Sequence, residues 1–267
     1  MPNEADTCRK FVVPKLQAAG WDTDPHCLNE QVTFTDGRII AAGSKGHRRP
    51  GKRADYLLRY RPDLSIAVVE AKASYSSAAD GLQQAKDYAE ILGLQFAYAT
   101  NGHEIVEFDF LKGCERTIPD FPAPDEVWRR LLAGNGLSEQ TADRLLTPAY
   151  HLSGKSPRYY QEIAINRAIQ AILQGQKRVL LTMATGTGKT VVAFQICWKL
   201  WSSRWNRDPR KEYRRPRILY LADRNILIDA SISDPENQLG GRPIERSPQG
   251  AHTRHLIESV GLIVGGY

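Results

Sequence analysis

The order of apolar and polar residues predicts two successive regions. The first is a mixed sheet with helices, and the second has alternating strands and helices. Residues 65–72 alternate with a period of two, which places Glu70 and Lys72 at the end of one otherwise apolar strand face. Residues 53–60 read as the neighbouring strand, and the polar turn 61–64 joins the two as a hairpin. The hairpin therefore brings Asp55 beside Glu70.

Helical spacing of apolar residues marks several further segments. An N-terminal helix begins at Glu4, is capped by Asn3, is kinked at Pro14 and ends at Gly20. The other predicted helices cover residues 82–92, 125–132, 138–146 and 190–201, and a further helix after Gln161 carries Ile165, Ile169 and Ile172. Residues 178–183 predict a buried parallel strand, and residues 217–224 predict the next one.

These elements divide the chain near residue 146. Residues 1–146 form one predicted domain, and residues 147–157 have the Pro, Gly and Ser content of a linker. Residues 158–232 form a second predicted domain of parallel α/β type. Residues 233–267 lack periodicity and predict an irregular tail.

The composition limits the class of protein, its compartment and its partners. The chain has 267 residues, 42% of them hydrophobic and 25% charged, as in a globular protein. It has no apolar stretch of membrane-spanning length and no signal peptide, and its four scattered cysteines favour reduced thiols in the cytoplasm. The net charge of +6 is consistent with nucleic-acid binding. Two basic runs, 47–53 and 204–217, are either phosphate contacts or solvated loops.

Residues 183–190 carry the pattern of a phosphate-binding loop between a strand and a helix. Lys189 is placed to reach the β- and γ-phosphates of ATP, and the Thr190 hydroxyl is placed to bind the Mg²⁺ that accompanies it. The backbone N–H groups that would surround the phosphates belong to Thr185, Gly186, Thr187 and Gly188.

A second set of residues predicts a Mg²⁺ site for hydrolysis of phosphodiester bonds. Asp55, Glu70 and the Ala71 carbonyl supply the hard oxygen ligands, and Lys72 supplies a positive charge for the reacting phosphate. The alternative is an exposed Glu70–Lys72 salt bridge with no catalytic role.

Several of these motifs resemble known families. Asp55 with Glu70-Ala71-Lys72 resembles the PD-(D/E)xK nuclease signature, although Ala54 stands where proline is usual. Gln84 and Tyr88, four residues apart on one helix face, resemble the Gln-x-x-x-Tyr motif of type I restriction enzymes. That resemblance also implies that the N-terminal helix offers Glu4 to the nuclease site.

Residues 183–190 resemble motif I of superfamily 2 helicases and translocases, with Met183 where the common loop has glycine. The resemblance implies that Gln161 reads the adenine of ATP and that Arg224, in motif Ia, contacts the DNA backbone. The alternatives are a surface glutamine that caps a helix and a solvated arginine.

The order of motifs over residues 1–230 resembles the R (restriction and motor) subunits of type I restriction enzymes. The resemblance implies a PD-(D/E)xK nuclease-like mixed sheet flanked by helices and followed by an incomplete RecA-like domain. It also implies ATP-dependent translocation and cleavage of unmodified duplex DNA, with methyltransferase (M) and specificity (S) subunits as partners. Type III or repair nuclease–helicases and a non-catalytic ATP- or DNA-binding fragment remain alternatives.

The later motor motifs are missing from residues 225–267. We therefore expect a truncated or frame-disrupted subunit whose residues after about 232 are unrelated to the family. On this expectation the nuclease domain is whole, whereas ATP hydrolysis by this chain is doubtful.

Overall fold

The computed structural model describes residues 4–35, 39–42, 45–48, 51–150, 157–184, 186–208, 210, 214–216, 218–221 and 261–263. For 39–42, 45–48, 219–221 and 261–263 only the backbone is described. The chain forms two compact units, residues 1–136 and residues 137–267. None of the described helices is long and apolar enough to cross a membrane.

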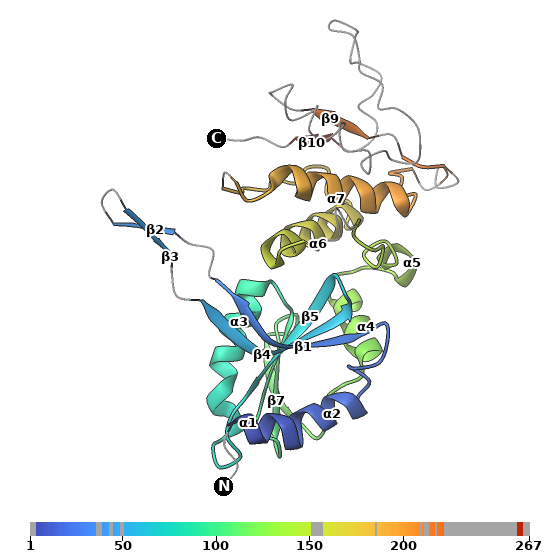
Figure 1. Cartoon of the computed structure of the whole chain (residues 1–267). Helices are drawn as coiled ribbons and strands as arrows, with labels where there is room; N and C mark the ends of the chain where they lie inside the picture. The colour runs from blue at the N-terminus through green and yellow to red at the C-terminus, as the bar shows by residue number, and fades with distance from the viewer. Residues whose placement is uncertain are drawn as a thin grey trace, which may run out of the picture. The chain divides into compact units, whose positions relative to one another are not determined.

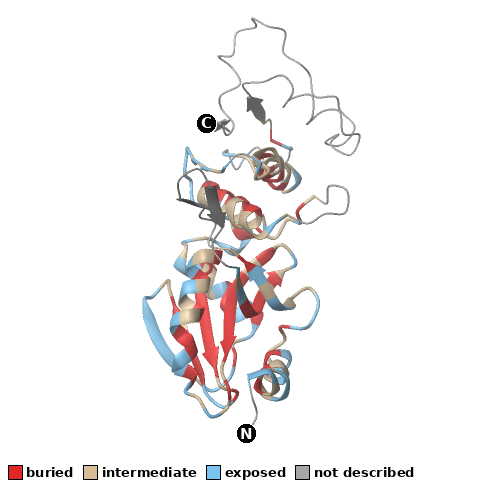
Figure 2. Cartoon of the chain, turned by 60° about the vertical axis from the view of Figure 1, so that its left-hand side comes forward, coloured by how far each residue is buried: buried red, intermediate tan, exposed pale blue. Residues whose placement is uncertain are grey.

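A six-stranded sheet organises the first unit, in the order β1-β4-β5-β6-β7-β8 (Figure 1). Only the β5–β6 pair is parallel, and the connection between these strands carries helix α3. The central strands are buried, whereas most of β8 is exposed (Figure 2). The strands are β1 (Cys27–Phe34), β4 (Lys52–Arg61), β5 (Leu64–Ala71), β6 (Phe96–Thr100), β7 (Ile105–Asp109) and β8 (Cys114–Ile118). The predicted hairpin of residues 53–72 is confirmed as β4 and β5.

Helices cover both faces of this sheet (Figure 1). The short 3-10 helix η2 (Ala78–Gly81) leads into α3 (Leu82–Leu92), which packs on the face that carries Ala99 and Val106. On the opposite face, α4 (Pro124–Gly134) lays Arg130 over the ring of Phe96 and Trp128 against Tyr60. A separate hairpin of β2 (Ile39–Ala42) and β3 (Lys45–Arg48) connects β1 to β4.

The N-terminal helix has three parts. An α-helical turn, α1 (Glu4–Thr7), continues as a π-helical segment, η1 (Cys8–Val12), and then as α2 (Val13–Ala18). Pro14 lies in the first turn of α2 and has no N–H to donate, so the irregularity predicted at this proline takes the form of a wider helical segment before it. Gly20, at φ +94°, follows the helix in a left-handed conformation.

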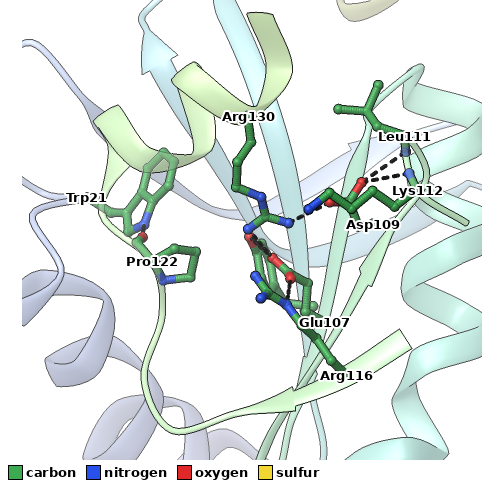
Figure 3. Close-up of polar contacts among 9 residues, drawn as sticks. Trp21, Glu107, Asp109, Leu111, Lys112, Arg116, Pro122 and Arg130 are labelled. Atoms are coloured by element: carbon green, nitrogen blue, oxygen red, sulfur yellow. Dashed lines mark hydrogen bonds and ion pairs between the residues drawn. The ribbon is translucent and has the colours of Figure 1, made fainter. Parts of the chain in front are cut away.

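A buried ion-pair network holds α4 to the sheet (Figure 3). The Arg130 guanidinium donates to Glu107 at 2.7 Å and to Asp109 at 2.8 Å, and Arg116 donates to the same Glu107 at 2.5 Å. The Tyr98 hydroxyl also donates to Glu107, at 2.9 Å. Burial acts to raise the pKa of Glu107, but the hydrogen bonds from these three side chains outweigh it and lower that pKa.

The second unit contains helices α5 (Glu139–Ala142), α6 (Tyr159–Leu173) and α7 (Lys189–Ser202). The two compact units divide at 136/137, and the segment before Tyr150 is bonded to α7 of the second unit. Lys199 donates to the Leu145 carbonyl at 3.1 Å, and the Gln195 amide bonds both backbone groups of Tyr150. Residues 147–150 are therefore docked on a helix rather than acting as a linker, and residues 151–156 lie outside the described part.

The prediction of a strand at residues 178–183 is wrong. This segment has no strand conformation, and Leu180 is 87% exposed. A buried parallel strand needs neighbouring strands for its backbone groups. Here β9 (Leu219–Leu221), which confirms part of the strand predicted at 217–224, pairs instead with β10 (Gly261–Ile263). The prediction of an irregular tail therefore fails at residues 261–263.

We expect Arg130→Met to lower the free energy of unfolding of the first unit by about 3–5 kcal/mol. The substitution leaves the fully buried Glu107 carboxylate without its principal cation. Denaturant unfolding measures the change. Arg129→Met is the matched control, because the exposed Arg129 donates to the Asp125 carbonyl and to no carboxylate among the described residues. Equal effects of the two substitutions would contradict the network's role.

Candidate active site

Two carboxylates meet where β4 and β5 stop pairing through their backbones. The last backbone pair at this end is Tyr56–Val69. Beyond it, the Asp55 N–H donates to Glu70 Oε1 at 3.3 Å, and the Ala71 N–H donates to Asp55 Oδ2 at 2.8 Å. Asp55 is 8% exposed and Glu70 is 1% exposed. The sheet itself therefore fixes the two carboxylates side by side, as the sequence predicts.

Helix α3 completes this cluster. The Gln84 amide accepts from Lys72 Nζ at 2.9 Å and donates to Glu70 Oε2 at 2.7 Å and to the Tyr88 hydroxyl at 3.1 Å. Gly81 leaves room for the lysine, because a Cβ there would lie 3.2 Å from Lys72 Cε. The residues predicted from the Gln-x-x-x-Tyr spacing thus join the two carboxylates and the lysine in one hydrogen-bonded cluster.

The charge on Glu70 is unfavourable in this setting. Its pKa is raised to about 8, chiefly because burial disfavours the charged form and secondly because Asp55 places a like charge beside it. Lys72 offsets part of this shift, and Glu4 adds a smaller contribution to it. A cation between the carboxylates would remove the repulsion.

The donor set fits Mg²⁺. Two carboxylates and a backbone carbonyl are hard oxygen ligands, and Mg²⁺ usually keeps several of its waters when only one or two carboxylates bind it. Among the described residues, no three His, Cys, Asp or Glu side chains form a group suited to a metal. The Ala71 carbonyl, as a third protein ligand, stays a prediction.

Glu4 lies near enough for its charge to act on Glu70, but it is not hydrogen-bonded into the cluster. It is exposed on α1, and no hydrogen bond joins it to Asp55 or Glu70 in the described part of the chain. The same helical segment contacts the sheet through Cys8, which hydrogen-bonds Tyr56. Because Tyr56 follows Asp55 along β4, the two side chains point to opposite faces of the sheet. The contribution of Glu4 therefore remains a prediction.

Sequence reasoning missed one residue of the cluster. Gln31, on β1, donates from Nε2 to Asp55 Oδ1 at 3.2 Å. Nothing in the sequence around residue 31 signals this contact, because it depends on the register between β1 and β4. That register places Glu30 opposite Tyr56 and Val32 opposite Ala54, so Gln31 lies opposite Asp55.

The predicted phosphate loop lies in the second unit. Gly186 and Gly188 have φ of +77° and +83°, which residues with side chains rarely adopt, and α7 begins directly after Gly188. Lys189 Nζ donates to the loop carbonyls of Met183 at 3.3 Å and Ala184 at 3.4 Å. These bonds are long, so a phosphate can replace them. Thr190 lies in the first turn of α7, and Thr185 lies outside the described residues.

Gln161, the predicted adenine reader, is bonded to the loop instead of being a free surface residue. It accepts from the Arg158 N–H at 2.9 Å, so it also caps α6, and it donates to the Thr187 carbonyl at 2.8 Å. It is 8% exposed. Adenine reading by Gln161 stays a prediction. Arg224 lies outside the described residues.

Comparison with known proteins decides which family these two units represent. The chain is 42% identical over 245 residues to the endonuclease subunit of the type I restriction enzyme EcoAI from Escherichia coli. That match covers 89% of the chain. The chain belongs to the type I restriction endonuclease subunit family. It is also 30% identical over 193 residues, 67% of its length, to the EcoKI endonuclease subunit of Escherichia coli strain K12.

A solved structure of this family has the same fold. It is a fragment of a proposed HsdR subunit of a type I restriction enzyme from Vibrio vulnificus YJ016, 61% identical, with a TM-score of 0.75. The match covers 83% of this chain and 42% of that one. The chain spans 29% of the EcoAI subunit and 15% of the EcoKI subunit. It therefore corresponds to less than half of each of these relatives.

The second unit has a family match of its own. Residues 154–244 match the family model described as type III restriction enzyme, res subunit. This match confirms a helicase-like segment, and it extends past residue 232, where the sequence predicted the family likeness to end. The type III alternative is not favoured, because the type I matches span most of the chain.

We expect Gly188→Ala to weaken ATP binding at least about tenfold. A Cβ at this position would collide with Gln161 Nε2, and the left-handed backbone disfavours any side chain. Calorimetric titration of the chain with ATP and Mg²⁺ measures the change. Gly175→Ala is the matched control, since Gly175 has φ +85° but nothing within 4 Å of the added Cβ. Equal binding by both variants would contradict the predicted loop.

Proposed function

We propose that the first unit is a Mg²⁺-dependent endonuclease that cleaves duplex DNA. The observation that carries the proposal is the hydrogen-bonded cluster of Asp55, Glu70, Lys72 and Gln84 at the end of the β4–β5 pair. Buried carboxylates held together without a cation are costly to the fold, and a metal site is the usual reason for keeping them.

Each residue has a defined task in this proposal. Asp55, Glu70 and the Ala71 carbonyl would hold Mg²⁺, and the chemistry that the metal would supply is polarisation of the scissile phosphate and a lower pKa of a bound water. Lys72 presents its ammonium group to the negative charge that develops on the phosphate. Gln84 holds Lys72 and Glu70 in one orientation, and Tyr88 anchors the amide of Gln84.

The second unit supports the wider role of an HsdR-type subunit. We propose that residues 183–190 bind Mg²⁺-ATP, with Lys189 on the phosphates and Thr190 on the metal. In the whole enzyme, ATP-driven translocation of unmodified DNA would precede cleavage, with M and S subunits as partners and the cytoplasm as the location. The supports are the family of the chain and its motor segment.

Nicking of supercoiled plasmid by the purified chain tests the nuclease. We expect nicking that requires Mg²⁺ and falls by on the order of 10²-fold or more in Asp55→Ala and in Lys72→Ala. Asp55→Ala removes a metal ligand, whereas Lys72→Ala removes the cation that faces the reacting phosphate. Loss of activity in both variants distinguishes this site from nicking by a contaminating nuclease.

Matched controls come from the exposed surface of the same unit. Asp120→Ala and Lys112→Ala remove the same charges from exposed positions, so nicking should stay at the wild-type rate. The proposal fails when the folded wild-type chain does not nick with Mg²⁺, or when Asp55→Ala and Lys72→Ala both remain active.

A further inference from the structure

Gln31 has an unusual backbone for its place in the fold. It lies inside strand β1, yet its φ is +54°, in the left-handed region that residues with side chains rarely adopt. The register with β4 is the same before and after it, from Cys27↔Arg59 to Phe34↔Lys52. No inserted residue therefore accounts for the conformation, as it would in a bulge.

Packing does not account for the conformation either. Gln31 is exposed, so little side-chain burial is available to offset an unfavourable backbone. Strained backbone conformations persist where the surrounding structure holds them, and they cluster at functional sites. The contact that Gln31 does make is with the carboxylate of Asp55.

With this contact, both carboxylate oxygens of Asp55 accept a hydrogen bond. Its Oδ2 accepts from the Ala71 N–H of β5 at 2.8 Å, and its Oδ1 accepts from Gln31 Nε2 of β1 at 3.2 Å. Asp55 is thus held from both neighbouring strands, one oxygen by each. Without the amide of Gln31, the carboxylate could turn about its bond to Cβ while keeping its bond to Ala71.

We propose that Gln31 is a positioning residue of the nuclease site, an inference that rests on the function proposed above. Its amide fixes the plane of the Asp55 carboxylate, so that Asp55 meets the divalent cation in one orientation. The left-handed backbone of Gln31 is what directs the amide to this oxygen. Partners of this kind, which hold a metal ligand without touching the metal, typically contribute 10- to 100-fold to metal affinity.

A calorimetric titration of the chain with Mn²⁺ alone measures metal affinity and so tests the proposal without relying on activity. We expect Gln31→Ala and Gln31→Gly each to weaken Mn²⁺ binding by about tenfold. The Mg²⁺ concentration for half-maximal nicking should rise by a similar factor, and nicking should recover at high Mg²⁺. Glycine adopts the left-handed conformation without strain, so Gln31→Gly should unfold at a higher temperature than Gln31→Ala.

Gln83→Ala is the matched control. Gln83 is also exposed and also donates to an aspartate, Asp87, at 2.7 Å, but this pair lies outside the cluster. Its loss should leave Mn²⁺ affinity unchanged. The proposal is overturned when both Gln31 variants bind Mn²⁺ as tightly as the wild type, or when their only defect is lower thermal stability. A wild-type chain that neither binds Mn²⁺ nor nicks DNA would instead refute the proposed nuclease.

Discussion

The first unit depends on a pair of buried carboxylates that also act as backbone acceptors. Where β4 and β5 stop pairing, Glu70 accepts the Asp55 N–H and Asp55 accepts the Ala71 N–H. The same oxygen atoms therefore satisfy the end of the sheet and form the candidate metal site. Their repulsion is built into the fold, and two polar side chains meet it there: Lys72, which directly follows β5, and Gln84, which comes from α3. In this unit the site is part of the sheet rather than an addition to it.

The second unit has a more local organisation. Its phosphate loop keeps two left-handed glycines and the start of α7, although residues 178–183 form no strand before it. Gln161 of α6 holds this loop in place of a strand, because it bonds the loop at Thr187 and occupies the space beside Gly188. Contacts from α7 to Leu145 and Tyr150 draw the preceding segment into the same unit.

Much of this could be predicted from the sequence, since its signals are local. Alternation along residues 65–72 and the short turn before them were sufficient to place Asp55 beside Glu70, and four-residue spacing was sufficient to place Gln84 with Tyr88. The failures concern longer-range contacts. The apolar run at 178–183 resembles a buried strand, but strand formation depends on neighbours that no local pattern reveals. Gln31 was missed because its role arises from register and from one unusual φ, neither of which its residue type signals.

The central claim is that the fold holds Asp55 and Glu70 together in order to bind a divalent cation. A crystal structure of the chain grown with Mn²⁺, with anomalous data, tests it most directly. The account predicts one strong anomalous peak in contact with both carboxylates and the Ala71 carbonyl. A folded first unit with no peak there, or with Mn²⁺ only on exposed carboxylates elsewhere, would contradict it.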